Sequence, residues 1–157
     1  MKMSLNDLRK KIEVVDFFSS EGIINSELLN DVGTNNVKEI ATLLSERIED
    51  PTEKDRRGKI VIHSNELKIN QIRKFYDAFL NVYNAKVPSM DEKKVRLLML
   101  KSNAEYSANR LKVKTLELFM KNRLDIVLKQ KTKESFDKYL KAYKLHFEAL
   151  VGYFPKN

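Results

Sequence analysis

The chain has 157 residues, a length that fits one domain able to bury roughly two-thirds of its unfolded surface. It contains no cysteine, which excludes disulfides, thiolate catalysis and cysteine-based zinc sites. Its net charge of +8 is divided unevenly: residues 51–157 carry 24 Lys and Arg against 12 Asp and Glu, whereas residues 1–50 carry 6 against 10. A basic surface favours a polyanionic partner such as nucleic acid, although composition alone equally allows a merely basic protein.

The N-terminus leads directly into a charged helical pattern, without the apolar stretch of a signal peptide. No later run reaches the roughly 18 apolar residues of a membrane span. We therefore expect a cytoplasmic protein that does not enter a membrane.

The spacing of apolar residues predicts an all-α, single-domain helical bundle of about five to six helices. Only four Gly and three Pro interrupt the chain, and most apolar residues recur at intervals of three and four. Within this one domain we distinguish acidic N-terminal helices (1–50), a charged loop (50–65) and a basic helical core (66–154).

The acidic part is predicted to hold two helices and a turn. The first helix spans residues 5–18 and the second spans 35–49, behind the cap candidates Thr34 and Asn35. A short turn at 26–30 lies between them.

Residues 50–65 break the helical pattern and are predicted to be a mobile loop. Asp50-Pro51 cannot continue a helix, and the run 54–59 is charged and contains a flexible glycine. The apolar trio at 60–62 is too short for more than one isolated strand without a partner. The charged run is a secondary candidate for binding a polyanion, but runs of mixed sign are usually just solvated.

The third helix is predicted over residues 69–83, where apolar residues repeat at three and four without exception. Arg73 and Lys74 project from its opposite side. They either contact phosphate oxygens or keep the helix soluble.

The fourth helix is predicted to begin at Pro88, followed by Asp91 and Glu92, whose charges suit a helix N-terminus. It carries two apolar stripes on opposite sides, which predicts a helix sandwiched between neighbours. One stripe is Leu97, Leu100, Ala104 and Ala108, and the other is Val95, Met99 and Tyr106.

Cations are dense along this helix, because seven of them and one anion lie within residues 93–114. This density exceeds what solubility requires and favours a bound polyanion. Lys94 and Lys101 lie on one flank, and Arg96, Asn103 and Arg110 lie at a spacing of seven on the other. The candidate nucleic-acid contacts are Arg73, Lys74, Lys94, Arg96, Lys101, Arg110, Lys112 and Lys114.

A bend at 112–115 is predicted to precede a fifth helix over 115–128, and a last helix begins near Thr132. The aromatic residues of the last helix are predicted to be core rather than base-stacking platforms. Tyr106 and Tyr153 are left open as possible exceptions.

The sequence offers little material for catalysis or for a metal site. Neither His63 nor His146 has a carboxylate or a second histidine at metal-ligand spacing, and His146 lies among aromatic residues as a core or edge residue. A Gly-rich phosphate loop and a nucleophile elbow are both missing from the sequence. We therefore predict a non-enzymatic protein without cofactor or metal.

Three segments, in order, resemble the small subunit of type III-A CRISPR interference (Csm) complexes. They are LKINQIRKFY at residues 67–76, LKSNAEYSANR at 100–110 and FEALVGY at 147–153. The sequence departs from the family at Lys68, where a Ser or Thr cap is usual. It departs again at Ser102-Asn103, which replace a pair that often includes proline and a basic residue.

The resemblance implies a non-catalytic helical bundle, present in several copies in a ribonucleoprotein that runs along guide and target RNA in antiviral defence. The neighbouring backbone subunit would cut the target, and this subunit would support single-stranded RNA in a basic groove that includes Arg73, Lys74, Lys101 and Arg110. Partners would be target and guide RNA, the other Csm subunits and further copies of the chain.

Two other interpretations remain at this stage. The chain is alternatively a structural or regulatory helical oligomer whose positive charge only keeps it soluble. A double-stranded DNA binder would need a recognition helix, and no helix-turn-helix spacing stands out in the sequence.

Overall fold

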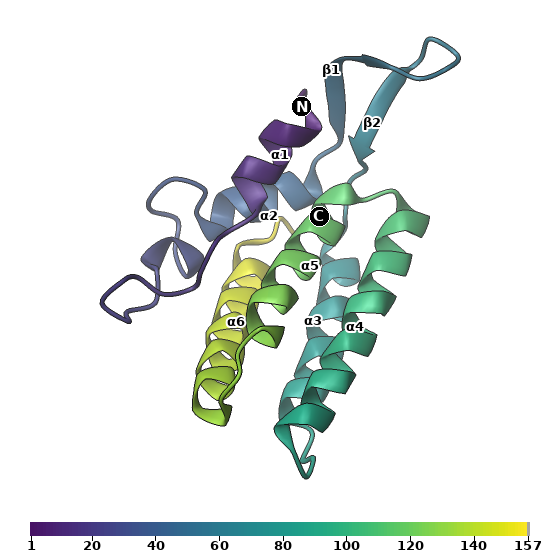
Figure 1. Ribbon diagram of the computed structural model, residues 1–157. Coiled ribbons are helices and arrows are strands. Elements are labelled where there is room, and N and C mark those ends of the chain that lie inside the picture. Colours follow the sequence, from purple (N-terminus) through teal and green to yellow (C-terminus); the bar gives the residue numbers. More distant parts are fainter. Residues whose placement is uncertain (157) are drawn as a thin grey trace.

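Four long helices pack together and form the basic half of the protein in the computed structural model, which describes residues 1–156 (Figure 1). All four were predicted from the apolar spacing, and the all-α, single-domain fold class is confirmed. The helices are α3 (Ile69–Asn84), α4 (Met90–Leu111), α5 (Lys114–Leu128) and α6 (Lys133–Tyr153).

The acidic N-terminal part contains α1 (Leu5–Ile12), a short 3-10 helix η1 (Ser26–Leu28) and α2 (Val37–Ser45). These elements cover one side of the bundle, where α1 packs on α5 and α2 packs on α6 (Figure 1).

The first helix is shorter than predicted, because the chain becomes extended at Glu13 instead of continuing to residue 18. The Asn122 side chain binds both backbone groups of Val14: it accepts from the N–H at 3.1 Å and donates to the carbonyl at 3.0 Å. These groups would be used inside a continuing helix, so a tertiary contact ends α1.

The second helix also differs from the prediction at both ends. Asn36, and neither Thr34 nor Asn35, is its N-cap, and its side chain accepts from the N–H of Glu39 at 3.0 Å. The helix ends at Ser45 because Ile48 belongs to the strand that follows.

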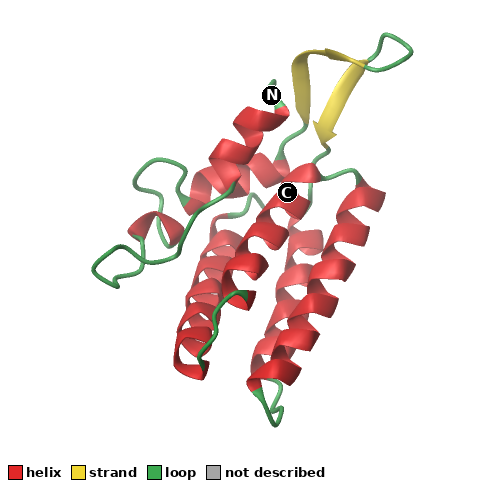
Figure 2. Ribbon diagram, in the orientation of Figure 1, coloured by secondary structure: helices red, strands yellow, loops and turns green. Residues whose placement is uncertain are grey.

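The predicted loop at 50–65 is instead a β-hairpin that projects beyond the end of the bundle (Figure 2). Strand β1 (Ile48–Lys54) pairs antiparallel with β2 (Ile60–Ser64), so the apolar trio has a partner after all. The prediction fails because Pro51 looked like a break. Pro51 lies within a register shift of β1, where the ladder does not need its missing N–H.

The core lies between the N-terminal part and helices α3, α5 and α6. The predicted aromatic seam of α6 is confirmed as core, since Phe136, Tyr143 and Phe147 are buried. The rings of Tyr143 and Phe147 pack against Phe79 of α3 and Phe119 of α5. Tyr153 is half-buried at the end of the helix.

Helix α4 is packed on one side only, which contradicts the predicted sandwich. Its first apolar stripe is buried against α3 and α5, whereas the second faces solvent in the described part of the chain. The exposed residues are Val95 (54%), Leu98 (49%), Met99 (60%) and Tyr106 (70%).

Both ends of α4 are defined by caps. The helix begins at Met90 rather than at Pro88, and Ser89 is its N-cap, whose hydroxyl accepts from the N–H of Glu92 at 3.2 Å. Lys112 ends it in the left-handed region, with φ of 58°, and produces the predicted bend into α5.

Every helix within residues 1–156 is too short or too polar to span a lipid bilayer.

Candidate nucleic-acid interface

A groove runs along the surface between α3 and α4. It consists of two hollows of about 310 and 390 Å³ that share Ala78, Leu100 and Asn103 and are therefore continuous. We call this surface the basic groove. Its other lining residues are Gln71, Lys74, Phe75, Asn81, Val82, Arg96, Met99, Ala104, Ser107, Arg110 and Leu111.

The groove has an apolar floor and a polar rim. Leu100 and Ala104 are buried and form part of the floor, together with the half-buried Phe75 and Ala78. The small side chains of Ala78 and Ala104 leave room between the two helices. Apolar packing in the floor holds α3 and α4 at a fixed spacing. The charge of the groove therefore comes from the side chains on its rim.

Three exposed cations stand on the rim: Lys74 from α3, and Arg96 and Arg110 from α4. Within residues 1–156, none of them forms an ion pair or a side-chain hydrogen bond, and no Asp or Glu lines the groove. At about 100° per residue, Arg96, Asn103 and Arg110 form one row along the helix. This row leaves its charges available to an external anion.

The other edge of α4 uses its cations differently. Lys94 donates to the backbone carbonyl of Gln130 and lies 5.6 Å from the ring centroid of Phe136. Lys101 pairs with Asp125 of α5, with Nζ and Oδ1 2.5 Å apart. These lysines join α4 to its neighbours.

The remaining predicted contacts lie outside the groove. Arg73 is exposed but does not line the groove, since it lies about 100° around α3 from Lys74. Lys112 is exposed at the bend, and Lys114 pairs with Glu117 one turn along α5. The structure therefore gathers three of the eight predicted residues on one surface.

Four neutral polar residues of the groove were not among the predicted contacts: Gln71, Asn81, Asn103 and Ser107. Helical spacing contains the signal, because positions 100, 103, 107 and 110 share one face of α4 and positions 71, 74, 78 and 81 share one face of α3. The sequence does not reveal that these two faces meet.

The match to known proteins lies over the same region. A family model described as Csm2 Type III-A matches residues 46–155. The chain belongs to the Csm2 Type III-A family. The match confirms the resemblance noted above and, by starting at residue 46, also includes the β-hairpin. Searches of the curated proteins and of the solved structures gave no match.

As a Csm2 protein, the chain is a small subunit of a type III-A CRISPR effector complex. Such subunits are non-catalytic structural components, which confirms the non-enzymatic prediction. Family membership also implies association with the other Csm subunits and with guide and target RNA.

Residues 1–45 of this Csm2 protein lie outside the matched range. A buried polar network binds them to helices α5 and α6. Arg123 of α5 is fully buried, and it donates to the carbonyl of Ile12 and to Nε2 of His146, the latter at 3.3 Å. On the other side of the imidazole, Nδ1 lies 2.7 Å from the carbonyl oxygen of Leu28. The network therefore spans α1, η1, α5 and α6.

Burial determines the protonation of this network. It lowers the pKa of His146 to about 3, with the charge of Arg123 acting in the same direction, and lowers the pKa of Arg123 to about 10. His146 is thus neutral near pH 7, with its Nδ1–H donating to Leu28 and Nε2 accepting from Arg123. The prediction of His146 as a core or edge residue is confirmed, whereas no sequence signal marked Arg123 as buried.

No carboxylate lies at metal-ligand spacing from His63 in the sequence, but the fold brings one to it. Its Nε2 lies 2.8 Å from Oδ2 of Asp50, across the two strands of the hairpin. The spacing of 13 residues between them hid this contact, because the hairpin itself was not predicted.

Proposed function

We propose that this Csm2 subunit supports single-stranded RNA, the target or the guide, along the basic groove without reading its sequence. The three cations on the rim carry the proposal, because Lys74, Arg96 and Arg110 are exposed and have no ion-pair partner within residues 1–156, so that they can approach phosphates. Lys and Arg contacts to phosphate supply affinity that does not depend on base identity. Base identity is left to pairing with the guide.

Salt-dependent binding of a fluorescent single-stranded RNA, followed by anisotropy, tests this proposal. The test variant is Arg96→Ala/Arg110→Ala. The matched control is Lys121→Ala/Lys141→Ala, which removes the same charge from exposed positions that do not line the groove. An unrelated RNA and a DNA duplex serve as further ligands.

We expect similar affinity for both RNAs and a steep loss of affinity with salt. The slope of log affinity against log salt should fall by roughly 1.4 in the groove variant, since each phosphate contact in a single strand contributes about 0.7. The control should keep most of its binding. Equal losses in both variants would indicate attraction by the whole basic surface and would count against the groove.

A second candidate function is self-association, supported by the exposed stripe of α4. The acidic part, residues 1–50, also exposes apolar side chains, namely Val15 (89%), Ile23 (62%) and Val32 (68%). An acidic, partly apolar surface of one copy is complementary to the basic, partly apolar face of α4 in the next copy. Such a contact joins different surfaces and builds a head-to-tail row.

Sedimentation of the variant Val95→Asp/Leu98→Asp tests this second candidate. We expect a concentration-dependent oligomer of the unaltered protein and a monomer of the variant. If the unaltered protein oligomerises but does not bind RNA at moderate salt, the helical oligomer without intrinsic RNA binding is the better description.

We also infer a cytoplasmic location, in keeping with a chain that has no cysteine.

A further inference from the structure

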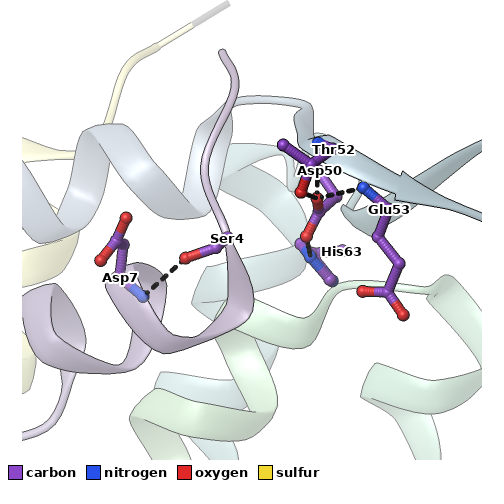
Figure 3. A network of polar contacts seen from close by, with 6 residues as sticks. All are labelled: Ser4, Asp7, Asp50, Thr52, Glu53 and His63. Atoms are coloured by element: carbon purple, nitrogen blue, oxygen red, sulfur yellow. Dashed lines mark hydrogen bonds and ion pairs between the residues drawn. The ribbon is translucent and has the colours of Figure 1, made fainter.

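The β-hairpin carries a cluster of three ligand-type side chains that the RNA-binding proposal does not use. Asp50 and Glu53 come from β1 and His63 comes from β2 (Figure 3). One ligand atom from each of the three side chains lies within 4.8 Å of the other two. The cluster therefore combines one imidazole nitrogen with two carboxylates, a ligand set that suits Zn²⁺ and similar divalent ions.

Two of the three side chains are already held in position. The side chains of Asp50 and His63 are only 5% and 9% exposed. Oδ1 of Asp50 accepts from the N–H groups of Thr52 at 2.9 Å and Glu53 at 2.7 Å, which leaves Oδ2 directed at the imidazole (Figure 3). Outer hydrogen bonds of this type orient metal ligands before the ion arrives.

The carboxylate is also charged in the folded protein. The backbone hydrogen bonds from Glu53 and Thr52, with a further contribution from His63, hold the pKa of Asp50 well below its usual range. The same hydrogen bonds that orient Asp50 therefore also stabilise its charged form.

A metal ion needs only small movements to enter. The ligand atoms of a tetrahedral zinc site are separated by roughly 3.3 Å, as its metal–ligand distances of about 2.0 Å require. The Asp50–His63 distance of 2.8 Å would open slightly, and the exposed Glu53 would swing inward. Water would complete the coordination on the exposed side.

We propose that Asp50, Glu53 and His63 bind one divalent transition-metal cation, with Zn²⁺ as the best fit, and that this ion joins the two strands of the hairpin. This inference departs from the sequence-based expectation, which was a protein without a metal site. It is independent of the proposed RNA function because none of these residues lines the basic groove.

Titration of Zn²⁺ into the chelator-treated full chain by calorimetry tests the proposal, with the visible absorption of bound Co²⁺ as a second readout. The variant Glu53→Gln alters only an exposed side chain. His63→Asn retains an amide that can donate to Asp50 but is a poor metal ligand. Glu21→Gln is the matched control, because it removes an exposed carboxylate elsewhere. Circular dichroism verifies that each variant is folded.

We expect one equivalent of Zn²⁺ to bind and to raise the melting temperature. Affinity should fall at least roughly tenfold in Glu53→Gln and more in His63→Asn, since losing even an outer partner of a metal ligand costs this much. Glu21→Gln should behave like the unaltered protein. The proposal would be overturned if Zn²⁺ showed no saturable binding to the unaltered protein. It would also be overturned if both hairpin variants bound Zn²⁺ as tightly as the unaltered protein does. No RNA is present, so the result does not depend on the groove.

Discussion

The two edges of α4 show how cations on one helix serve different purposes. On the edge that faces α3, Arg96 and Arg110 are exposed and have no partner within residues 1–156. On the edge that faces α5, Lys94 and Lys101 bind a backbone carbonyl and a carboxylate of neighbouring segments.

Arg123 on α5 extends this contrast into the core, where its guanidinium is completely buried and bound by neutral acceptors. Charge density along the sequence therefore does not locate a binding surface by itself. A cation that already has a partner contributes to stability, and a cation without one is available to a ligand. Four predictions test this distinction, from the largest expected effect to the smallest.

Arg123→Met should lower the free energy of unfolding by roughly 2–4 kcal/mol, because two buried acceptors, the Ile12 carbonyl and Nε2 of His146, lose their donor. Urea denaturation followed by circular dichroism measures this loss. The salt slope of RNA binding by the folded variant should stay unchanged. A loss of RNA binding without a loss of stability would break the contrast between engaged and free cations.

Acidification should weaken the same network. His146 has a pKa of about 3 in the folded protein, whereas the ordinary value for histidine is 6.5, so the unfolded chain binds an extra proton between these values. This contribution to stability is complete above pH 6.5 and is lost as the pH falls, at no more than about 1.4 kcal/mol per pH unit. Denaturation between pH 7 and pH 4.5 should show this slope in the unaltered protein, and His146→Gln should show a shallower one.

The triple variant Lys74→Ala/Arg96→Ala/Arg110→Ala should show the opposite pattern to Arg123→Met. We expect the salt slope of RNA binding to fall by roughly 2, from three lost phosphate contacts. Stability should stay within about 0.5 kcal/mol, as is usual for exposed side chains without partners. Anisotropy and urea denaturation on the same samples measure both quantities. A large loss of stability would show that these cations have a structural role.

Lys101→Ala should have the smallest effect. Its ion pair with Asp125 is partly exposed, with side chains 22% and 46% accessible, so its loss should cost about 0.5 kcal/mol. RNA affinity should change little. If Lys101→Ala weakens RNA binding as much as Arg110→Ala does, both edges of α4 contact RNA and the contrast fails.

The long helices were predictable because apolar spacing and caps act locally. The ends of α4 and α5 came within two residues of expectation, and the aromatic residues of α6 are in the core as predicted. The hairpin was not predictable from the same signals, since its pairing joins Ile48 to Ser64 across a proline and a charged turn. Strand pairing depends on contacts distant in sequence, which a local pattern does not contain.

The candidate groove was predictable only in part. The spacing of residues along α4 predicts the row of Arg96, Asn103 and Arg110. It does not predict that Lys94 and Lys101 already have partners, because these partners, Gln130 and Asp125, lie far along the chain. The burial of Arg123 could not be predicted from the sequence either, because a single arginine in an amphipathic helix is usually a surface residue. Its burial follows from how the N-terminal part folds over α5.

The contact between that N-terminal part and the helices that hold it has a consequence for sequence variation. Asn122, Arg123 and His146 bind main-chain atoms of residues 12, 14 and 28, and no side chain on the N-terminal side takes part in these bonds. These bonds thus recognise the path of the chain at residues 12, 14 and 28, whereas the bond from the Tyr139 hydroxyl to Oδ1 of Asp16, at 2.8 Å, depends on a side chain of the N-terminal part. Substitutions at those three positions are free to occur as long as the packing survives, whereas the three residues that hold them are not interchangeable.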